Sequence, residues 1–174
     1  MSRTRSHIRD CVTHNPGIHF NEITRTLDIA TGQTQYHLRK LLSEGLLTSE
    51  EICGRTHYYP PTYSRWERGA IALLRRETTR ELVLLLLEAD DNRLPPAEMT
   101  DRLELARSTV EWHLSNLVEH DVLAKRTTEI QNGEQLIVEL ADPDDVYRLL
   151  REIEPRLSDR LADRFTRFTD ELFE

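Results

Sequence analysis

The sequence predicts a mainly α-helical protein of the α+β class, built from two copies of one module and a C-terminal helical segment. The stretch ATGQTQYHLRKLLSEGLL at residues 30–47 recurs without a gap at residues 106–123, as ARSTVEWHLSNLVEHDVL. A gapless repeat of this length indicates a repeated fold. Several segments carry apolar residues at helical spacing. Short β-forming segments flank turn residues after each copy of the stretch, and these predict small β-hairpins.

The repeat divides the chain into four predicted parts. They are a first module at 1–62, a linker helix at 63–77, a second module at 78–141 and a C-terminal helical dimerisation segment at 142–174. Positions 76 residues apart hold the same residue in several places, as at Glu22 and Glu98 or at His37 and His113. The matching begins upstream of the repeated stretch, so we expect the two modules to share several elements.

Each module is expected to place three helices before a β-hairpin. In the first module the helices and strands are predicted at residues 4–14, 20–27, 31–44, 46–52 and 57–59. Asn15, Pro16 and Gly17 end the first helix, because these residue types favour turns. Thr31 or Gly32 is predicted to cap the third helix. The hairpin turn falls at residues 53–55.

The second module repeats this order. It is predicted to contain a helix at 79–89, a short helix from 95, a third helix from 108, and strands at 123–130 and 134–140. Ser108 and Glu111 have the spacing of a capping box at the start of the third helix. Asn132-Gly133 between the two strands is a strong signal for a tight hairpin turn.

Three helices, the last two joined by a tight turn, and a following hairpin form a winged helix-turn-helix. The segment STVEWHLSNL resembles the third helix of ArsR- and MarR-type repressors. The first module resembles the first domain of archaeal predicted regulators with two helix-turn-helix domains, through Pro16, Gly17, His19, Glu22, Ile23, Tyr36, His37 and Leu38. The resemblance covers about residues 5–140. It implies a DNA-binding transcription regulator.

The outward face of the third helix in the first module suits a DNA major groove. At 100° per residue, Gln35, Tyr36, Arg39, Lys40 and Ser43 point away from the core. Glutamine pairs with adenine, and arginine or lysine pairs with guanine or phosphate. The alternative is an ordinary solvated helix face. The predicted contacts to double-stranded DNA, including two near the wing tip, are Thr31, Gln33, Gln35, Tyr36, Arg39, Lys40, Arg55 and His57.

The corresponding face of the second module carries Glu111 and Glu119, whose carboxylates repel phosphate. This module is expected to bind DNA weakly, to dimerise or to contact a protein, since an exposed aromatic such as Trp112 anchors interfaces. Its candidate contact residues are Arg107, Thr109, Trp112, Ser115 and Asn116. His37 and His113 lie at the edge of the core stripe and are predicted to be packed and hydrogen-bonded.

The C-terminal segment and the linker carry further apolar stripes. Residues 63–76 have helical spacing, and Asp142 or Asp144 is predicted to cap a helix that Pro155 separates from the next. The tail stripe packs on the second module or on a second chain. We expect a homodimer, because winged-helix regulators read paired half-sites. The predicted dimer contacts are Leu150, Ile153, Leu157, Leu161, Phe165, Phe168 and Leu172.

The charge of the chain supports a second interpretation. Its formal net charge is −8, with 2 lysines among 23 basic residues, a composition typical of salt-loving archaea. Acidity normally argues against nucleic-acid binding. The alternative function is therefore an acidic tandem winged-helix adaptor that binds proteins of the chromosome or transcription machinery.

Other functional classes find little support in the sequence. No nucleophile triad, phosphate-binding glycine loop or metal-ligand spacing is present, so we expect no enzyme activity, no cofactor and no metal. The two cysteines, Cys11 and Cys53, form no CxxC pair. No apolar run approaches the roughly 18 residues of a membrane span, and we expect a cytoplasmic protein.

Overall fold

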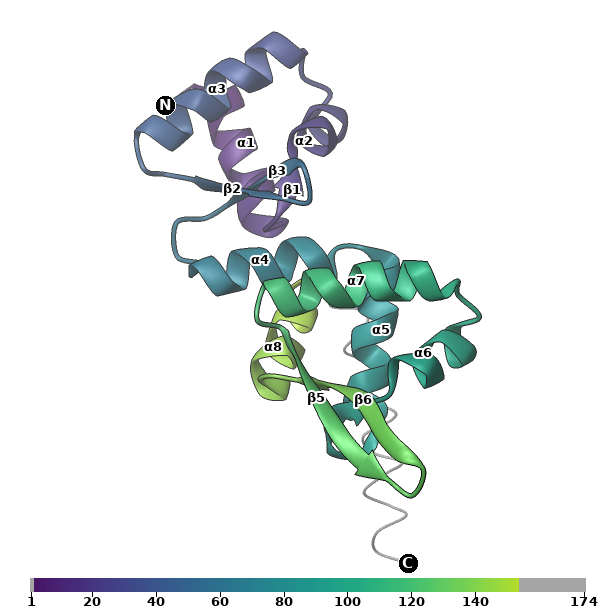
Figure 1. The fold of residues 1–174 in the computed structure, drawn as a ribbon. Helices are drawn as coiled ribbons and strands as arrows, with labels where there is room; N and C mark the ends of the chain where they lie inside the picture. Colours follow the sequence, from purple (N-terminus) through teal and green to yellow (C-terminus); the bar gives the residue numbers. More distant parts are fainter. Residues whose placement is uncertain (1, 154–174) are drawn as a thin grey trace, which may run out of the picture. The chain divides into compact units, whose positions relative to one another are not determined.

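The computed structural model describes residues 2–153, in two compact units that divide between Arg76 and Glu77. Each unit combines helices with a three-stranded antiparallel sheet (Figure 1). The described residues contain eight α-helices and two such sheets, so the fold is mixed α and β and has the form of winged-helix modules. The five predicted dimer contacts from Leu157 to Leu172 lie outside the described residues.

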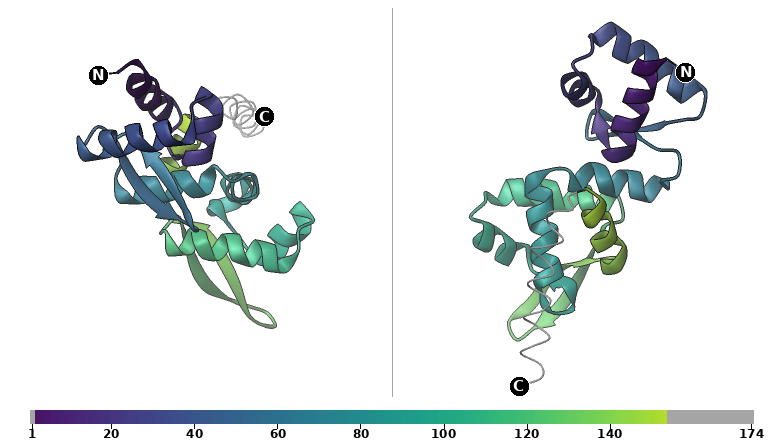
Figure 2. Two further views of the ribbon diagram at one scale, coloured as in Figure 1. Left: turned by 90° about the horizontal axis from the view of Figure 1, so that it is seen from above. Right: turned by 180° about the vertical axis from the view of Figure 1, so that it is seen from behind.

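The first unit contains α1 (Arg3–His14), β1 (Ile18–His19), α2 (Phe20–Leu27), α3 (Thr31–Ser43), β2 (Thr48–Ile52), β3 (Arg55–Tyr59) and α4 (Arg65–Leu74). Its sheet has the strand order β1-β3-β2, and the β2–β3 hairpin forms the wing (Figure 2). The apolar faces of α1, α2 and α3 meet beside this sheet. The buried core there consists of Ile8, Cys11, Val12, Ile18, Ile23, Leu38, Leu41, Leu47 and Tyr58.

The turn after α1 fixes how the chain enters β1. Asn15 ends the helix by donating from its backbone N–H and its side-chain Nδ2 to the Cys11 carbonyl. Gly17 follows with a φ of +80°, a left-handed conformation that favours glycine. A Cβ atom on Gly17 would lie 2.7 Å from Cγ2 of Ile71 on α4. The glycine is therefore required both by the backbone conformation and by the close approach of α4.

Helix α4 is attached to the rest of the first unit at both of its ends. At its start, Ser64 and Glu67 form a capping box. Tyr59 donates from its hydroxyl to the Arg68 carbonyl at 2.7 Å, and Arg68 donates to Glu50 on β2 at 2.9 Å. After the helix ends, Arg75 forms an ion pair with Glu22 of α2. The segment predicted as a linker thus includes a helix that makes polar contacts with the first unit.

The second unit contains α5 (Glu77–Glu88), a short 3-10 helix η1 (Asp90–Asn92), β4 (Arg93–Leu94), α6 (Pro96–Leu103), α7 (Arg107–Glu119), β5 (Leu123–Ile130), β6 (Gly133–Leu140) and α8 (Pro143–Ile153). Its sheet has the order β4-β6-β5. The predicted hairpin is confirmed, but Ile130 lies opposite Gly133, so its two turn residues are Gln131 and Asn132 and not Asn132 and Gly133. Asp142 caps α8 as predicted, because its Oδ1 accepts from the Asp145 N–H at 3.0 Å.

The repeat seen in the sequence extends to backbone details. Helices α3 and α7 follow the N-cap residues Ala30 and Ala106, 76 positions apart. The helices before them both end in a left-handed residue, Asp28 with a φ of 50° and Glu104 with a φ of 52°. These matches show that the helix-turn-helix geometry itself is duplicated, so the two units can be compared position by position.

Two local predictions are wrong. Ser108 and Glu111 form no capping box: Ala106 is the N-cap of α7, and Glu111 pairs with Arg107 instead. Neither Thr31 nor Gly32 caps α3, which begins after Ala30 without a side-chain cap. The sequence interpretation also missed β1 and β4. Each of these strands has two residues and exists only through its pairing with β3 or β6.

Candidate nucleic-acid interface

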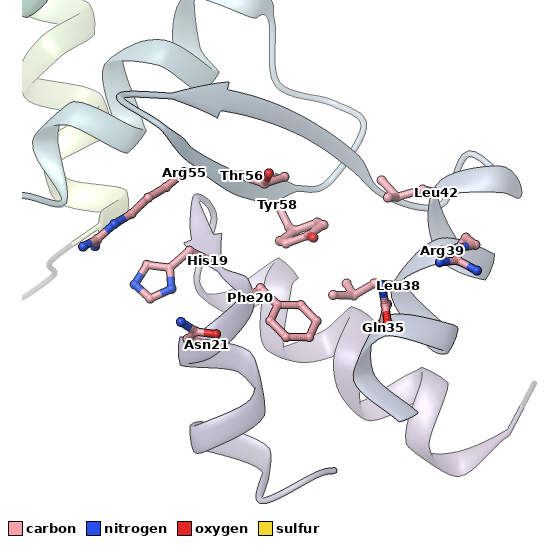
Figure 3. Close-up of a pocket in the computed structure, with 10 residues that line it drawn as sticks. All are labelled: His19, Phe20, Asn21, Gln35, Leu38, Arg39, Leu42, Arg55, Thr56 and Tyr58. Atoms are coloured by element: carbon pink, nitrogen blue, oxygen red, sulfur yellow. The ribbon is translucent and has the colours of Figure 1, made fainter. Parts of the chain in front are cut away.

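A groove of about 610 Å³ lies between the start of α2, one side of α3 and the wing of the first unit. Figure 3 shows His19, Asn21 and Arg55 toward one end of this groove and Gln35 and Arg39 toward the other. The remaining lining residues are Phe20, Leu38, Leu42, Thr56 and Tyr58. The start of α2, α3 and the wing therefore surround one groove, which we call the first groove.

The cations on this surface have no acidic neighbour to neutralise them. Within the part of the chain that the structure describes, Arg39, Lys40 and Arg55 take part in no ion pair. By contrast, Arg5 of the same unit pairs with Glu44, and Arg68 pairs with Glu50. Unpaired and exposed guanidinium and ammonium groups are suited to phosphate, because no existing ion pair must break on binding.

The predicted α3 contacts all lie on the exposed side of the helix. Thr31, Gln33, Gln35, Tyr36, Arg39 and Lys40 are exposed. Tyr36 is 54% exposed, which is high for a large aromatic side chain. Gln35 and Arg39 line the first groove, together with Arg55 from β3. The helix thus presents its polar face along a stretch that also borders the wing.

His57 is not at the wing tip, and its predicted exposure is wrong. The side chain is 5% exposed, and Nδ1 is hydrogen-bonded to the Gly17 carbonyl at 2.7 Å. His57 shares a face of β3 with Tyr59, whose hydroxyl donates to the Arg68 carbonyl of α4, and its backbone pairs in register with His19 of β1. Burial lowers the pKa of His57 below its ordinary value of 6.5, and this effect exceeds the opposing one of the hydrogen bond. His57 therefore belongs to the interior of the first unit.

His19, Asn21 and Thr56 line the first groove and were missed by the sequence interpretation. Nδ1 of His19 accepts from the Glu22 N–H at 3.4 Å, so this histidine is the N-cap of α2. Burial lowers the pKa of His19. The Glu22 carboxylate partly opposes this effect, and the charge of Arg55 adds to it. Asn21 is at the first turn of α2, where backbone N–H groups attract anions. Only the position of His19 before a short helix could have signalled this site.

The two histidines shared by the repeat are half-buried, as their predicted packing requires. Nδ1 of His113 lies 2.9 Å from the Thr79 hydroxyl, so its predicted hydrogen bond is confirmed. Nδ1 of His37 is buried without a hydrogen-bond partner among the described residues. The prediction of a hydrogen-bonded histidine therefore holds in the second unit and is wrong for this nitrogen in the first.

A second groove of about 630 Å³ occupies the corresponding place in the second unit, between α6, α7 and the β5–β6 wing. Among the candidate contact residues of this unit, Arg107 and Ser115 line the second groove. Trp112 is 46% exposed, and Asn116 is half-buried and donates to the Trp112 carbonyl at 2.7 Å. Thr109 is half-buried. Arg107 is paired with Glu111 at 2.7 Å, unlike the basic residues on the α3 face.

The remaining predictions concern the dimer contacts, a metal site and a membrane-spanning helix. Leu150 is fully buried in a single chain, so its prediction as a dimer contact is wrong, while Ile153 is half-buried. In the described residues no group of three or more His, Cys, Asp or Glu side chains is placed to hold a metal ion. The helices described between residues 2 and 153 include none that is long and apolar enough to span a membrane.

Comparison with known proteins finds similarity to a family model, to a curated protein and to solved structures. Residues 2–71 match the HTH_HVO_0163_N family, described as an N-terminal HTH domain. The chain is 26% identical over 117 residues to the uncharacterized HTH-type transcriptional regulator MJ1398 of Methanocaldococcus jannaschii. That match covers 67% of this chain and 29% of the relative, so the chain spans less than a third of the relative's length.

The solved structure of a possible transcriptional regulator from Methanosarcina mazei Go1 aligns with 69% of this chain and 96% of its own. The sequence identity is 15% and the TM-score is 0.39. The family match is confined to the first unit. The first unit, which contains the first groove, is thus the one that resembles an N-terminal HTH domain.

Proposed function

We propose that this chain is a sequence-specific, DNA-binding transcription regulator that uses its first unit as the DNA reader. The family match to an HTH domain and the relative described as an HTH-type transcriptional regulator support this proposal. The observation that carries it is the set of Arg39, Lys40 and Arg55, which form no ion pair among the described residues and flank the exposed face of α3.

In the proposed complex, α3 lies in the major groove, where Gln35 and Arg39 reach base edges. The DNA backbone follows the first groove. His19 and Asn21 at the start of α2 and Arg55 on the wing contact its phosphates, because a helix N-terminus and an unpaired guanidinium both attract anions. Tyr36 and Lys40 contact the neighbouring strand from the opposite side of α3.

We further propose that two copies act together on paired half-sites, as the twofold symmetry of many operators requires. The dimer contacts we retain are Ile153 and the predicted residues beyond it. When two copies are joined in a dimer, the dimer also binds a duplex with two half-sites more tightly than one copy binds a single half-site. This gain needs no new protein–DNA contact. Sedimentation velocity on the full chain, with and without DNA, measures the stoichiometry directly.

The test of the reader uses a labelled duplex selected by the protein from a random pool, followed by anisotropy titrations at several salt concentrations. Lys40→Ala and Arg55→Ala should each weaken binding. Each should also reduce the slope of log K against log salt by about 1, the change expected when one cation no longer reaches a phosphate. Arg107→Ala on α7 is the matched control and should leave both quantities unchanged. Equal effects in all three variants would contradict the assignment of the reader to the first unit.

A further inference from the structure

The second groove is built from the same repeat positions as the first, yet its chemistry is different. Position by position, His19 is replaced by Pro95, Gln35 by Glu111 and Arg39 by Ser115. The groove also has an apolar surface. Val110 and Leu114 are buried at its base, and Leu136 on the wing is 45% exposed along its wall. The groups suited to phosphate in the first groove are thus replaced by apolar, acidic and small ones.

The wing beside this groove carries an unusual pair of like charges. Glu134 lines the groove, and Glu129 lies directly opposite it in the β5–β6 register, so both side chains are on one face of the hairpin. Like charges at opposed positions destabilise a hairpin. No described residue forms an ion pair with either carboxylate. A cation supplied from outside would relieve this repulsion.

The basic residues that line the second groove do not form an ion pair with Glu129 or Glu134. Arg107 is paired with Glu111 across one turn of α7, and Asp101 adds a further carboxylate to the groove lining, where Lys125 is the other basic residue. These carboxylates would repel a phosphate group. An apolar wall bordered by unpaired carboxylates instead complements a ligand with apolar side chains next to basic ones.

We propose that the second groove binds a short segment of a partner protein in which leucine-like side chains alternate with lysine or arginine. The apolar side chains contact Leu136 and the groove base, and the basic ones reach Glu134 and Glu129. The groove volume of about 630 Å³ is within the range of small-ligand and side-chain sites. This inference concerns a different surface from the proposed DNA reader.

The test uses a fluorescein-labelled synthetic peptide of alternating lysine and leucine, titrated with the full chain. A peptide with glutamate in place of lysine serves as the probe control. Glu134→Lys and Leu136→Ser should each weaken binding of the lysine–leucine peptide by about tenfold or more. Glu119→Lys makes the same charge change on α7 outside the groove lining. It should alter the affinity less than twofold.

Several results would overturn the proposal. One is an equal reduction of affinity in Glu119→Lys and Glu134→Lys, which would indicate non-specific attraction to an acidic protein. Others are unchanged binding in Leu136→Ser, equal binding of the glutamate peptide, or no binding of the lysine–leucine peptide at all. Loss of self-association in Leu136→Ser, without peptide binding, would assign the groove to a second copy. DNA binding measured on the same variants should stay unchanged, which separates this proposal from that of the reader.

Discussion

Arg75 donates from one guanidinium nitrogen to both carboxylate oxygens of Glu22, each at 2.9 Å. The two side chains are 19% and 27% exposed. This ion pair connects the residue that follows α4 to the first turn of α2. Arg75 also donates to the Pro16 carbonyl at 3.4 Å, so the same guanidinium holds the turn that leads into β1.

Replacing Glu22 by glutamine should destabilise the first unit. The substitution removes a hydrogen-bonded, half-buried ion pair, and the expected cost is about 1 to 2 kcal/mol in the free energy of unfolding. The repeat supplies the control: Glu98, at the equivalent position, forms an exposed ion pair with Arg102 on the same helix. Glu98→Gln should cost about 0.5 kcal/mol or less. Urea unfolding of both variants makes the comparison, and equal costs would contradict the importance of the Arg75 ion pair.

Gly17→Ala and Gly32→Ala should have opposite effects on stability. At Gly17, alanine combines an unfavourable φ of +80° with a Cβ placed 2.7 Å from Ile71. We expect the free energy of unfolding to fall by about 2 kcal/mol or more. At Gly32, within α3, no atom lies within 4 Å of the new Cβ, so alanine should stabilise by up to about 1 kcal/mol. Thermal unfolding measures both, and a tolerated alanine at position 17 would show that α4 moves easily.

The stability of the first unit should fall in mild acid because of His57. Its pKa is lowered in the folded state, so the unfolded chain takes up the proton more readily. The stabilisation from keeping this ring neutral is complete above about pH 6.5 and is lost as the pH falls below that value. Urea unfolding between pH 7.5 and 5.5 should show the decrease. His57→Gln, although less stable at neutral pH, should show a smaller decrease between those two pH values. A variant with the wild-type pH slope would mean that other groups cause it.

DNA affinity should change with pH in the opposite direction, through His19. The pKa of His19 is lowered in the free protein, and a phosphate bound beside it would raise that pKa. The complex then holds more protons than the free protein, so affinity should rise as the pH falls from 7.5 to 6.0. One proton limits the rise to about tenfold per pH unit. His19→Asn keeps a residue that caps α2 and removes the titrating ring. Anisotropy should show a flatter pH profile, and an unchanged profile would exclude His19 from the phosphate contacts.

Elements with a local cause were predictable from the sequence. The β5–β6 hairpin and the Asn15-Pro16-Gly17 helix end both occur where turn-forming residues predicted them, although the hairpin turn is one residue earlier than Asn132-Gly133. The polar outward face of α3 followed from its helical period. The features that failed depend on residues far away in the chain. β1 forms only because β3 is beside it, and His57 is buried although it lies close to the wing turn in the sequence.

The residues of the candidate site also divide into those that one helix predicts and those that only the tertiary structure brings together. The α3 residues could be chosen from one helix, whereas His19, Asn21 and Thr56 join them only when α2 and the wing fold against that helix. The capping box shows the limit of motif reading. Ser108 and Glu111 have the correct spacing without the contact, while Ser64 and Glu67 make the contact at the start of α4. The spacing of two residues shows that a contact between them is sterically possible. The tertiary structure determines whether that contact forms.

The short chain between α4 and α5 has a consequence for how the two proposed activities would combine. Only Arg75 and Arg76 separate the two helices, so the units are joined by a very short tether. Two sites on such a tether behave as if each were present near the other at millimolar concentration. A protein bound by the second unit would then be held near any promoter that the first unit occupies, for as long as it stays bound. Recruitment of this kind needs no conformational signal between the units, because proximity alone raises the local concentration of the bound protein.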